Sequence, residues 1–328
     1  MKKFLVVMVV LGLIVMSVPM SYAANIKVGV VYDVGGRGDK SFNDAAYKGL
    51  QDAVKKLGVE GKDVEPGEGG ANREELLRLL AEQGYDLVIG VGFLFTDALT
   101  KVAKEFPNTK FAIVDGVVEG LPNVRSLTFT EHEGSFLVGA IAGLMTKTNK
   151  VGFVGGMDMD LIHKFEAGYK AGVKYVNPKA QVLVNYIGVT GDAFKDPVKG
   201  KELALSQFKQ GADIVYHASG ASGEGVIEAA KEMKKFAIGV DSDQNWIAPG
   251  YVLTSMLKRV DVAVYNTIED VVKGKFTGGI KVYGLKENGV GVAYDQYNAN
   301  LIPASVRNKI SELKIDIIKG KIKVPSTR

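Results

Sequence analysis

The sequence predicts an α/β fold with two lobes, each built around a mainly parallel β-sheet. From residue 25 onward, short β-branched runs alternate with helical patterns of about 12 to 16 residues, which is typical of βαβ units. The chain of 328 residues is longer than one hydrophobic core usually fills. Its 40 glycines against 9 prolines suit many tight strand-to-helix turns. These observations favour two packed lobes over a disordered or fibrous chain.

The first half of the pattern contains three continuous apolar runs, as expected for strands that are covered on both faces. They span residues 26–33, 85–92 and 110–115. Residues 42–57 and 72–83 carry apolar residues at three- and four-residue spacing, which predicts crossover helices. Asn72 is placed to cap the second of these helices.

The second half repeats the pattern after a helix that we predict at residues 135–145. Its strands are expected at residues 150–155, 181–188, 212–218 and 236–241. The last part of the chain has strand patterns that are too short to build a third domain. They lie at residues 252–258, 282–285 and 290–294, with a helix predicted at residues 261–273.

We therefore expect the last strands to return and complete both earlier sheets. This arrangement gives an N-terminal lobe of residues 24–130 plus 259–283. The C-terminal lobe then comprises residues 131–258 plus 284–328. A chain that crosses back in this way has several hinge segments between its lobes and a cleft where the lobes face each other.

The N-terminus has the features of a secretory signal peptide spanning residues 1–23. Lys2 and Lys3 precede an apolar run, and Ser21 and Ala23 are small residues suited to a cleavage site after Ala23. The apolar run is shorter than the roughly 20 residues of a bilayer-spanning helix, which disfavours a retained anchor helix. We expect a mature protein that is soluble and exported.

Charge and residue inventory exclude several classes of function. The 41 Lys and Arg residues against 37 Asp and Glu give 41 − 37 = +4 without a dense basic block, so no nucleic-acid surface is expected. The chain has no cysteine, which excludes disulfides, thiolate metal sites, a cysteine nucleophile and a lipid-modified cysteine. It has no G-x-S-x-G motif, and His132, His163 and His217 form no local metal motif. We expect no enzyme activity, cofactor or metal.

Polar residues stand at the predicted carboxyl ends of the strands, where open parallel sheets bind their ligands. These residues are Asp33, Asp115, Asp241, Asp243 and Lys258. A single Asp after a strand is more typical of a turn or a helix cap. Several together predict carboxylates that accept hydrogen bonds from a polar, neutral ligand.

Two loops offer further candidate contacts. Residues 35–44 resemble a phosphate cradle, but they lack the order G-x-G-x-x-G, and the chain has no G-x-x-x-x-G-K-[ST] motif. Phe42 either begins the apolar stripe of the following helix or exposes its ring as a stacking platform for a planar ligand. The residues that follow His217, as far as Gly220, are small and would let a ligand approach the backbone closely.

Several blocks of the sequence resemble the basic membrane protein family of substrate-binding proteins of ATP-driven importers. They are residues 39–49 (DKSFNDAAYKG), 151–178, 196–204 (DPVKGKELA), 220–231, 238–245 (IGVDSDQN), 252–261 (VLTSMLKRVD) and 283–292 (YGLKENGVGV). The resemblance spans essentially the whole mature chain. It implies the type I periplasmic-binding-protein fold, in which three crossovers join two α/β lobes around the ligand. The best-understood members resemble a purine nucleoside receptor.

The resemblance also implies roles for individual residues. Phe42 is similar to one ring of an aromatic sandwich around a purine, and Asn43 beside it to a residue that bonds the base. Asp115 is similar to the carboxylate that contacts the edge of the base. Asp241 and Lys258 are similar to the pair that holds the ribose hydroxyls.

The remaining expected contacts are Asp33, which lines the same wall, and the second ring of the sandwich. Tyr216 is the first choice for that ring because it precedes the strand end at Gly220. Phe194 is the alternative, and relatives usually have phenylalanine near Tyr216.

The resulting hypothesis is a monomeric purine nucleoside receptor that serves ABC permease subunits and catalyses no reaction. Many relatives resemble lipoproteins with a cysteine at the mature N-terminus, and its absence here predicts a freely diffusing periplasmic protein without a lipid anchor. Two alternatives stay open. The same fold could bind a sugar or another small polar ligand, since aromatic rings also stack on pyranoses. A nucleoside hydrolase would need a water-activating metal or base, and Asp33, Asp115 and Asp241 could supply metal ligands only if they converge tightly.

Overall fold

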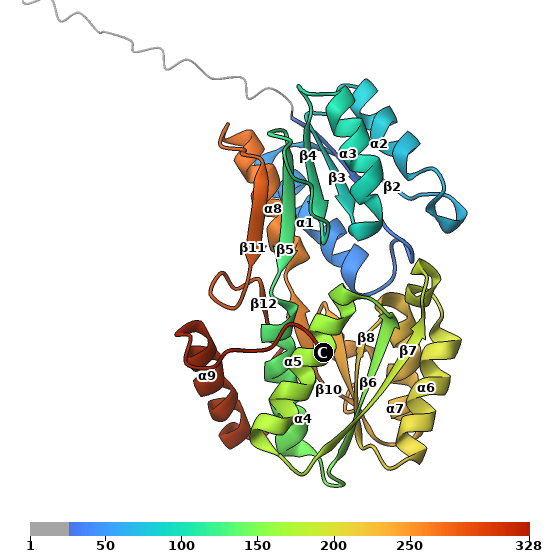
Figure 1. Ribbon diagram of the computed structural model, residues 1–328, viewed down its shortest axis with the longest axis vertical. Helices are drawn as coiled ribbons and strands as arrows, with labels where there is room; N and C mark the ends of the chain where they lie inside the picture. The colour runs from blue at the N-terminus through green and yellow to red at the C-terminus, as the bar shows by residue number, and fades with distance from the viewer. Residues whose placement is uncertain (1–25) are drawn as a thin grey trace, which may run out of the picture.

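The computed structural model describes residues 26–328, which form two lobes stacked along the long axis of the molecule (Figure 1). The predicted signal peptide, residues 1–23, lies outside these residues. Each lobe has a β-sheet with helices on both faces. The predicted α/β fold class is therefore confirmed.

The sheet of the first lobe is entirely parallel, with the strand order β11-β5-β4-β3-β1-β2. Its strands are β1 (Lys27–Val31), β2 (Glu60–Val64), β3 (Leu87–Val91), β4 (Lys110–Val114), β5 (Val124–Phe129) and β11 (Gly279–Tyr283). The helices of this lobe are α1 (Phe42–Leu57), α2 (Arg73–Glu82), α3 (Thr96–Glu105) and α8 (Val260–Val272).

The sheet of the second lobe has the order β12-β10-β9-β8-β6-β7, and only the β10–β12 pair within it is antiparallel. Its strands are β6 (Lys150–Met157), β7 (Gln181–Gly188), β8 (Ile214–Ala218), β9 (Phe236–Asp241), β10 (Val252–Lys258) and β12 (Val290–Val292). The helices are α4 (Glu131–Met145), α5 (Asp160–Val176), α6 (Pro197–Lys209), α7 (Gly223–Glu232) and α9 (Ala304–Ile318). Within residues 26–328, no helix combines the length and apolar character needed to cross a bilayer.

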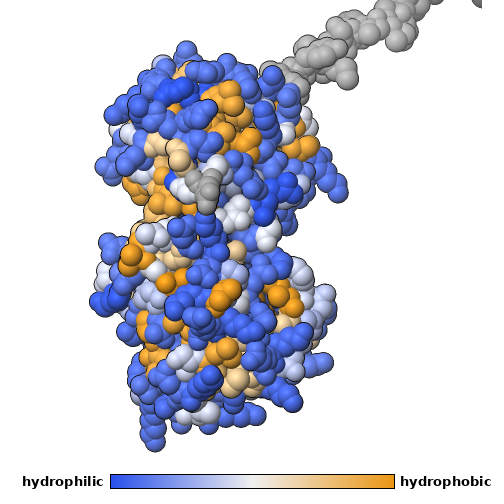
Figure 2. All heavy atoms as spheres, turned by 90° about the vertical axis from the view of Figure 1, so that its right-hand side faces the viewer, coloured by the Kyte–Doolittle hydropathy of each residue, from blue (hydrophilic) through white to orange (hydrophobic). Residues whose placement is uncertain are grey.

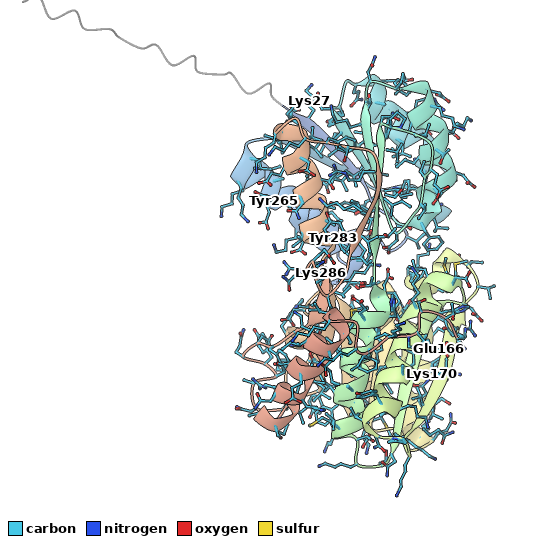
Figure 3. All side chains as sticks on the ribbon, turned by 60° about the vertical axis from the view of Figure 1, so that its left-hand side comes forward. Lys27, Glu166, Lys170, Tyr265, Tyr283 and Lys286 are labelled. Carbon is cyan, nitrogen blue, oxygen red and sulfur yellow. The ribbon has the colours of Figure 1, made fainter. Side chains whose placement is uncertain are left out.

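The chain passes between the lobes at three places: from β5 to α4, from β10 to α8, and from β11 to β12. Figure 3 shows Tyr283 and Lys286 of the third crossover at the junction. Hydrogen bonds join the first crossover to the third, because Thr130 N donates to Tyr283 O at 3.2 Å and Leu285 N donates to Glu133 Oε2 at 3.0 Å. These bonds hold neighbouring hinge segments in register.

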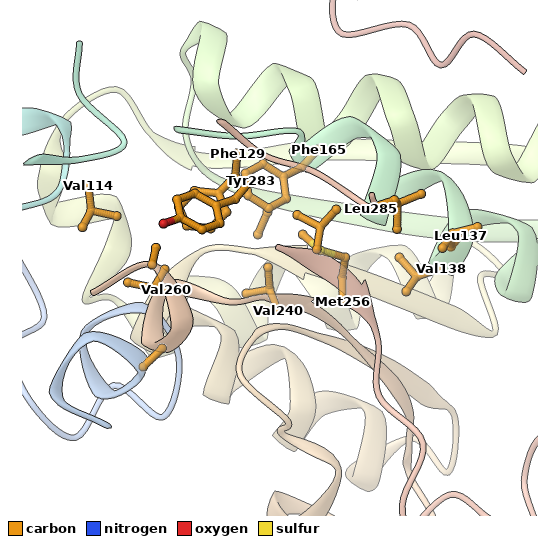
Figure 4. Close-up of a cluster of buried hydrophobic side chains, with 14 of the residues drawn as sticks. Val114, Phe129, Leu137, Val138, Phe165, Val240, Met256, Val260, Tyr283 and Leu285 are labelled. Carbon is orange, nitrogen blue, oxygen red and sulfur yellow. The ribbon is translucent and has the colours of Figure 1, made fainter. Parts of the chain in front are cut away.

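A hydrophobic core runs continuously through this junction (Figure 4). Phe129 of β5 stacks on Tyr283 of β11 with ring centroids 5.5 Å apart, and Phe165 of α5 lies beside them. Val114 contributes from the first lobe, and Met256 from the second. The lobes are therefore joined by buried apolar contacts as well as by covalent crossovers, which favours a defined hinge.

Several local features differ from the sequence-based expectation. Strand β2 was not predicted, because its residues Glu60–Val64 are mostly charged and sit at the edge of the sheet. Strand β5 was also not predicted. Asn72 lies at the N-cap of α2 without capping it through its side chain, and its Oδ1 instead accepts a hydrogen bond from Gly67 N at 2.8 Å.

Helices α4 and α5 approach so closely that their backbones touch. A Cβ atom added at Gly139 would lie 2.2 Å from the carbonyl oxygen of Tyr169, and one at Gly172 would lie 2.0 Å from that of Phe136. Only glycine fits at such a contact, because the obstructing atoms belong to the backbone and cannot rotate away.

We expect Gly139→Ala to lower the free energy of unfolding by about 1 to 3 kcal/mol, since the overpacking outweighs the higher helix propensity of alanine. Urea denaturation followed by circular dichroism measures this change. Leu144→Ala is the matched control on the same helix, because Leu144 is 40% exposed. Equal midpoints for Gly139→Ala and the wild type would contradict this packing argument.

Candidate functional site

A pocket that is partly open to solvent lies between the lobes, and residues from both lobes line it. Figure 2 shows the two lobes as rounded bodies with a narrower waist between them. Strand ends from both sheets meet at this pocket, as expected for parallel sheets. Every predicted site residue except Tyr216 lines it: Asp33, Phe42, Asn43, Asp115, Phe194, Gly220, Asp241 and Lys258.

Lys258, the last residue of β10, places a buried ammonium group in this pocket. Its side chain is only 2% exposed, and Nζ lies 2.5 Å from Asp115 Oδ2 and 3.2 Å from Glu131 Oε1. Burial by itself lowers the pKa of Lys258, but the carboxylates of Asp115, Glu131 and Asp241 outweigh it and raise the pKa above its usual value. The ammonium therefore stays charged over the physiological pH range.

Three aromatic rings surround the same ammonium group. The ring centroids of Phe42, Phe129 and Phe165 lie 5.3, 5.0 and 5.5 Å from Lys258 Nζ. The electron-rich faces of such rings attract a cation. Phe42 therefore has the cleft-facing position that the sequence left open, and it does not serve only as the first core residue of α1.

Asp115 and Asp241 occupy corresponding places in the two lobes, at the ends of β4 and β9. Both have a left-handed backbone, with φ of 64° and 62°. Residues with a Cβ rarely adopt this conformation, and where they do the strain often marks a functional position. The geometry turns both carboxylates into the pocket.

The surroundings of these two carboxylates differ. Asp241 Oδ2 accepts a hydrogen bond from Ser41 Oγ at 2.7 Å. Asp115 Oδ1 has no hydrogen-bond partner among residues 26–328. Burial raises the pKa of Asp115 to about 6 and that of Asp241 to about 7, while Lys258 opposes both shifts. A ligand that donates hydrogen bonds would satisfy the free oxygen.

Asp39 is a pocket residue that the sequence analysis did not single out. Its carboxylate accepts hydrogen bonds from the backbone N–H groups of Ser41, Asn43 and Asp44 at the start of α1. Burial raises its pKa to about 6, although these bonds oppose the shift. The signal available in the sequence was an acidic residue just before a predicted helix.

The amide of Asn43 is held in place by Asp39 and by the first strand. Asn43 Nδ2 donates to Asp39 Oδ2 at 3.1 Å, and Asn43 Oδ1 accepts from Asp33 N at 3.1 Å. These bonds distinguish the Oδ1 atom of the amide from the Nδ2 atom. They use one of the two Nδ2 hydrogens and leave the other for a further acceptor. Asn43 can therefore donate one hydrogen bond to a ligand.

Asp33 is fixed by an ion pair from α2 and by a glycine. Arg73 Nη2 lies 3.2 Å from Asp33 Oδ1, and both side chains are largely buried. A Cβ at Gly92 would lie 1.9 Å from Asp33 Oδ2, so glycine is required there. Burial raises the pKa of Asp33, and its bonds to Val34 N and Arg73 oppose the shift.

The second aromatic position corrects the first choice made from the sequence. Tyr216 does not line the pocket, because its ring is fully buried between Phe153 and Tyr169 at centroid distances of 5.6 and 5.1 Å. Its hydroxyl lies 3.2 Å from Ser135 Oγ. The alternative, Phe194, does line the pocket.

Two glycines make room for Phe194. A Cβ at Gly156 would lie 2.5 Å from its ring, and a Cβ at Gly220 would lie 3.2 Å from its carbonyl oxygen. Gly220 also has a left-handed φ of 55°.

Phe165 lines the same pocket from α5, and nothing in its helical pattern distinguished it from a core residue.

Other polar residues near the strand ends have structural partners. His217 is buried, with Nε2 2.9 Å from Gln244 Oε1, and burial lowers its pKa to about 4. Asp243 does not line the pocket and lies instead in an adjoining groove with Trp246. Among the described residues, no three His, Asp or Glu side chains form a group that could hold a metal, and this includes the set Asp33, Asp115 and Asp241.

Direct contacts between the lobes gather at the start of α1. Besides the Ser41–Asp241 bond, Ser242 Oγ donates to Ser41 O at 2.8 Å, and Gln244 Nε2 donates to Lys40 O at 3.1 Å. Lys40 Nζ lies 2.5 Å from Glu224 Oε2. Lys40 and Ser41, directly before α1, therefore contact the opposite lobe through both backbone and side chains.

We expect the stability of the ligand-free protein to fall as pH rises from about 4 to about 7. The pKa of Asp241 is about 7 when folded but about 3.9 when unfolded, so the native state binds the extra proton in this window. The loss due to Asp241 is on the order of 2 to 4 kcal/mol.

Asp241→Asn should flatten much of this slope, because the amide is neutral at every pH. Asp33, Asp39 and Asp115 add to the fall, whereas His217, whose pKa is lowered by burial, opposes it. Denaturant titrations between pH 4 and 8 measure the slope. Asp192→Asn, at an exposed site, is the control and should keep the wild-type slope. Identical slopes for all three proteins would contradict the expected burial of an ionised Asp241.

Comparison with known proteins assigns the chain to a family. The family model Bmp, described as ABC transporter substrate-binding protein PnrA-like, matches residues 26–328. The CD4+ T-cell-stimulating antigen of Listeria monocytogenes is 40% identical, over 91% of this chain and 87% of that protein. The ABC transporter nucleoside-binding protein BmpA of Lactococcus lactis is 36% identical, over 92% and 90%. An ABC transporter solute-binding protein from Aeropyrum pernix K1 has a crystal structure with a TM-score of 0.83 and 34% identity, over 92% of this chain and 94% of that one. The chain belongs to the Bmp family of PnrA-like substrate-binding proteins of ABC transporters.

Proposed function

We propose that this protein binds a purine nucleoside between its lobes and delivers it to the permease of an ABC importer. The observation that carries the proposal is one pocket that combines the rings of Phe42 and Phe194, from opposite lobes, with several buried carboxylates. Such rings suit a planar base, and carboxylates accept hydrogen bonds from hydroxyl and N–H donors. A relative from Lactococcus lactis is named a nucleoside-binding protein, which supports this ligand class.

In this proposal the base lies between Phe42 and Phe194. Asn43 donates its remaining Nδ2 hydrogen to an acceptor on the base. Asp115 Oδ1, which has no hydrogen-bond partner within residues 26–328, accepts a hydrogen bond from an N–H on the base edge. Each contact would pair a polar atom that is otherwise buried at a cost.

The ribose lies toward Asp241 and Lys258. Asp241 accepts from ribose hydroxyls through lone pairs that Ser41 leaves free. Lys258 has three N–H donors, and its pairing with Asp115 and Glu131 leaves capacity for a ribose oxygen. Both residues belong to the second lobe, whereas Phe42, Asn43 and Asp115 belong to the first.

Because the ligand contacts both lobes, it binds more tightly when they are closed, and this difference in affinity drives closure. The polar contacts around Ser41 form on the same movement. The closed pair of lobes then presents one continuous surface to the permease. No bond is made or broken in this cycle.

Calorimetry with inosine, guanosine, adenosine and ribose tests the ligand class. We expect saturable binding of at least one purine nucleoside and no comparable binding of free ribose, which lacks the base. Tight ribose binding without a nucleoside response would favour the sugar alternative and overturn the proposal. Incubation with inosine should release no free hypoxanthine, and catalytic release would instead support a hydrolase.

Replacement of Asp241 tests the binding geometry. Asp241→Ala should weaken nucleoside binding by about 2 to 5 kcal/mol, since it removes a buried, charged hydrogen-bond partner. Asp243→Ala is the matched control, because Asp243 is two residues away and does not line the pocket between the lobes. Unchanged affinity in Asp241→Ala, measured by the same calorimetry, would remove Asp241 from the ligand contacts.

A further inference from the structure

Glu131 is a buried carboxylate outside the pocket that none of the proposed ligand contacts uses. It is the first residue of α4, directly after the first crossover, and its side chain is 1% exposed. Neither of its carboxylate oxygens has a hydrogen-bond partner among residues 26–328. A buried carboxylate without hydrogen bonds is costly, so it calls for a physical explanation.

Two cations offset the charge of Glu131. Its Oε1 lies 3.2 Å from Lys258 Nζ, and its Oε2 lies 3.6 Å from Lys164 Nζ of α5. Lys258 is buried and lies at the end of β10, where the second crossover begins, whereas Lys164 is 37% exposed. Glu131 therefore joins two hinge segments through one ammonium group.

Lys258 is thus shared by two carboxylates, Glu131 on the hinge side and Asp115 on the pocket side. Its Nζ is 2.5 Å from Asp115 Oδ2, whereas Asp115 Oδ1 has no hydrogen-bond partner in the described part of the chain. If Glu131 did not hold part of the ammonium charge, Lys258 would pair more fully with Asp115. The charged groups that face this cluster are Lys258, Lys164, Asp115, Asp241 and the neighbouring His132.

We propose that Glu131 is a positioning residue for the binding site: it holds Lys258 from the hinge side and so keeps Asp115 available to the ligand. The role is indirect, because Glu131 is not among the residues that line the pocket. This inference rests on the proposed function only for the identity of the ligand. The coupling between Glu131, Lys258 and Asp115 can be measured without any ligand.

The chain offers a matched set of variants. Glu131→Gln keeps the shape of the side chain and removes its charge. Glu133→Gln is the control in the same helical turn, since Glu133 contacts Thr130 and Leu285 instead of Lys258. Lys164→Gln removes the exposed partner of Glu131, and it provides a test even if Glu131→Gln does not fold.

The first readout is the titration of the Asp115 carboxyl, followed by ¹³C NMR and assigned with Asp115→Asn. The wild-type pKa of Asp115 is about 6, and the charge of Glu131 contributes to raising it. Glu131→Gln should lower the midpoint by on the order of one pH unit. Lys164→Gln should raise it by a smaller amount, because Lys164 lowers the pKa of Asp115. Glu133→Gln should leave it unchanged.

The second readout is inosine binding measured by calorimetry at pH 7.5 and at lower pH. Glu131→Gln should bind about tenfold more weakly at pH 7.5. Its loss of affinity on acidification should begin at lower pH than in the wild type, because Asp115 stays ionised longer. A merely structural role would lower stability without moving this midpoint.

An unchanged Asp115 midpoint in both Glu131→Gln and Lys164→Gln would overturn the proposal, as would an equal shift in Glu133→Gln. A shifted midpoint with unchanged inosine affinity would also overturn it, since the coupling would then not serve binding. Failure of the wild type to bind any purine nucleoside would refute the proposed function alone. The Asp115 titration would still decide the role of Glu131 in that case.

Discussion

The buried ammonium of Lys258 is the interaction on which the rest of the site depends. It ends β10 at a crossover, contacts a carboxylate from each lobe, and lies among aromatic rings that belong to α1, β5 and α5. Without this cation, Asp115 and Glu131 would face each other in a region from which water is excluded. Like charges in that position are strongly unfavourable, so loss of the ammonium would disturb both the hinge and the pocket.

The topology explains why one residue can serve both places. The lobes use nearly the same sheet order, and the carboxyl ends of both sheets face the junction. Parallel strands put their terminal side chains at one edge, so Asp33 and Asp115 from the first sheet meet Asp241 and Lys258 from the second. The crossovers leave the sheets at the same edge, and the hinge and the ligand pocket are therefore built from adjoining residues.

Much of this site could be predicted from the sequence. The residues that were predicted wrongly or missed have clear physical causes. Strand ends are visible as polar residues after apolar runs, which located the four residues just named. Tyr216 was misplaced because β8 is buried on both faces, so its run carries no alternation to indicate which face a side chain takes. Phe165 occupies a helical stripe that looks like any core pattern, and Glu131 acquires its meaning only from Lys258, which is distant in the sequence.

The polar groups of the pocket also constrain which ligands it can select. Asp39, Asp115 and Asp241 are all buried enough for their pKa values to be raised, so each ionised carboxylate weakens the ligand-free fold. Asp39 recovers part of that cost from the backbone N–H groups of α1, and Asp241 from Ser41, but Asp115 retains an oxygen without a partner among the described residues. The remaining cost is recovered only when a hydrogen-bond donor arrives. Four carboxylates, including Asp33, and one ammonium line the pocket, so a ligand with negative charge would meet net repulsion there. The same arrangement that would favour neutral, donor-rich molecules would therefore disfavour their phosphorylated forms.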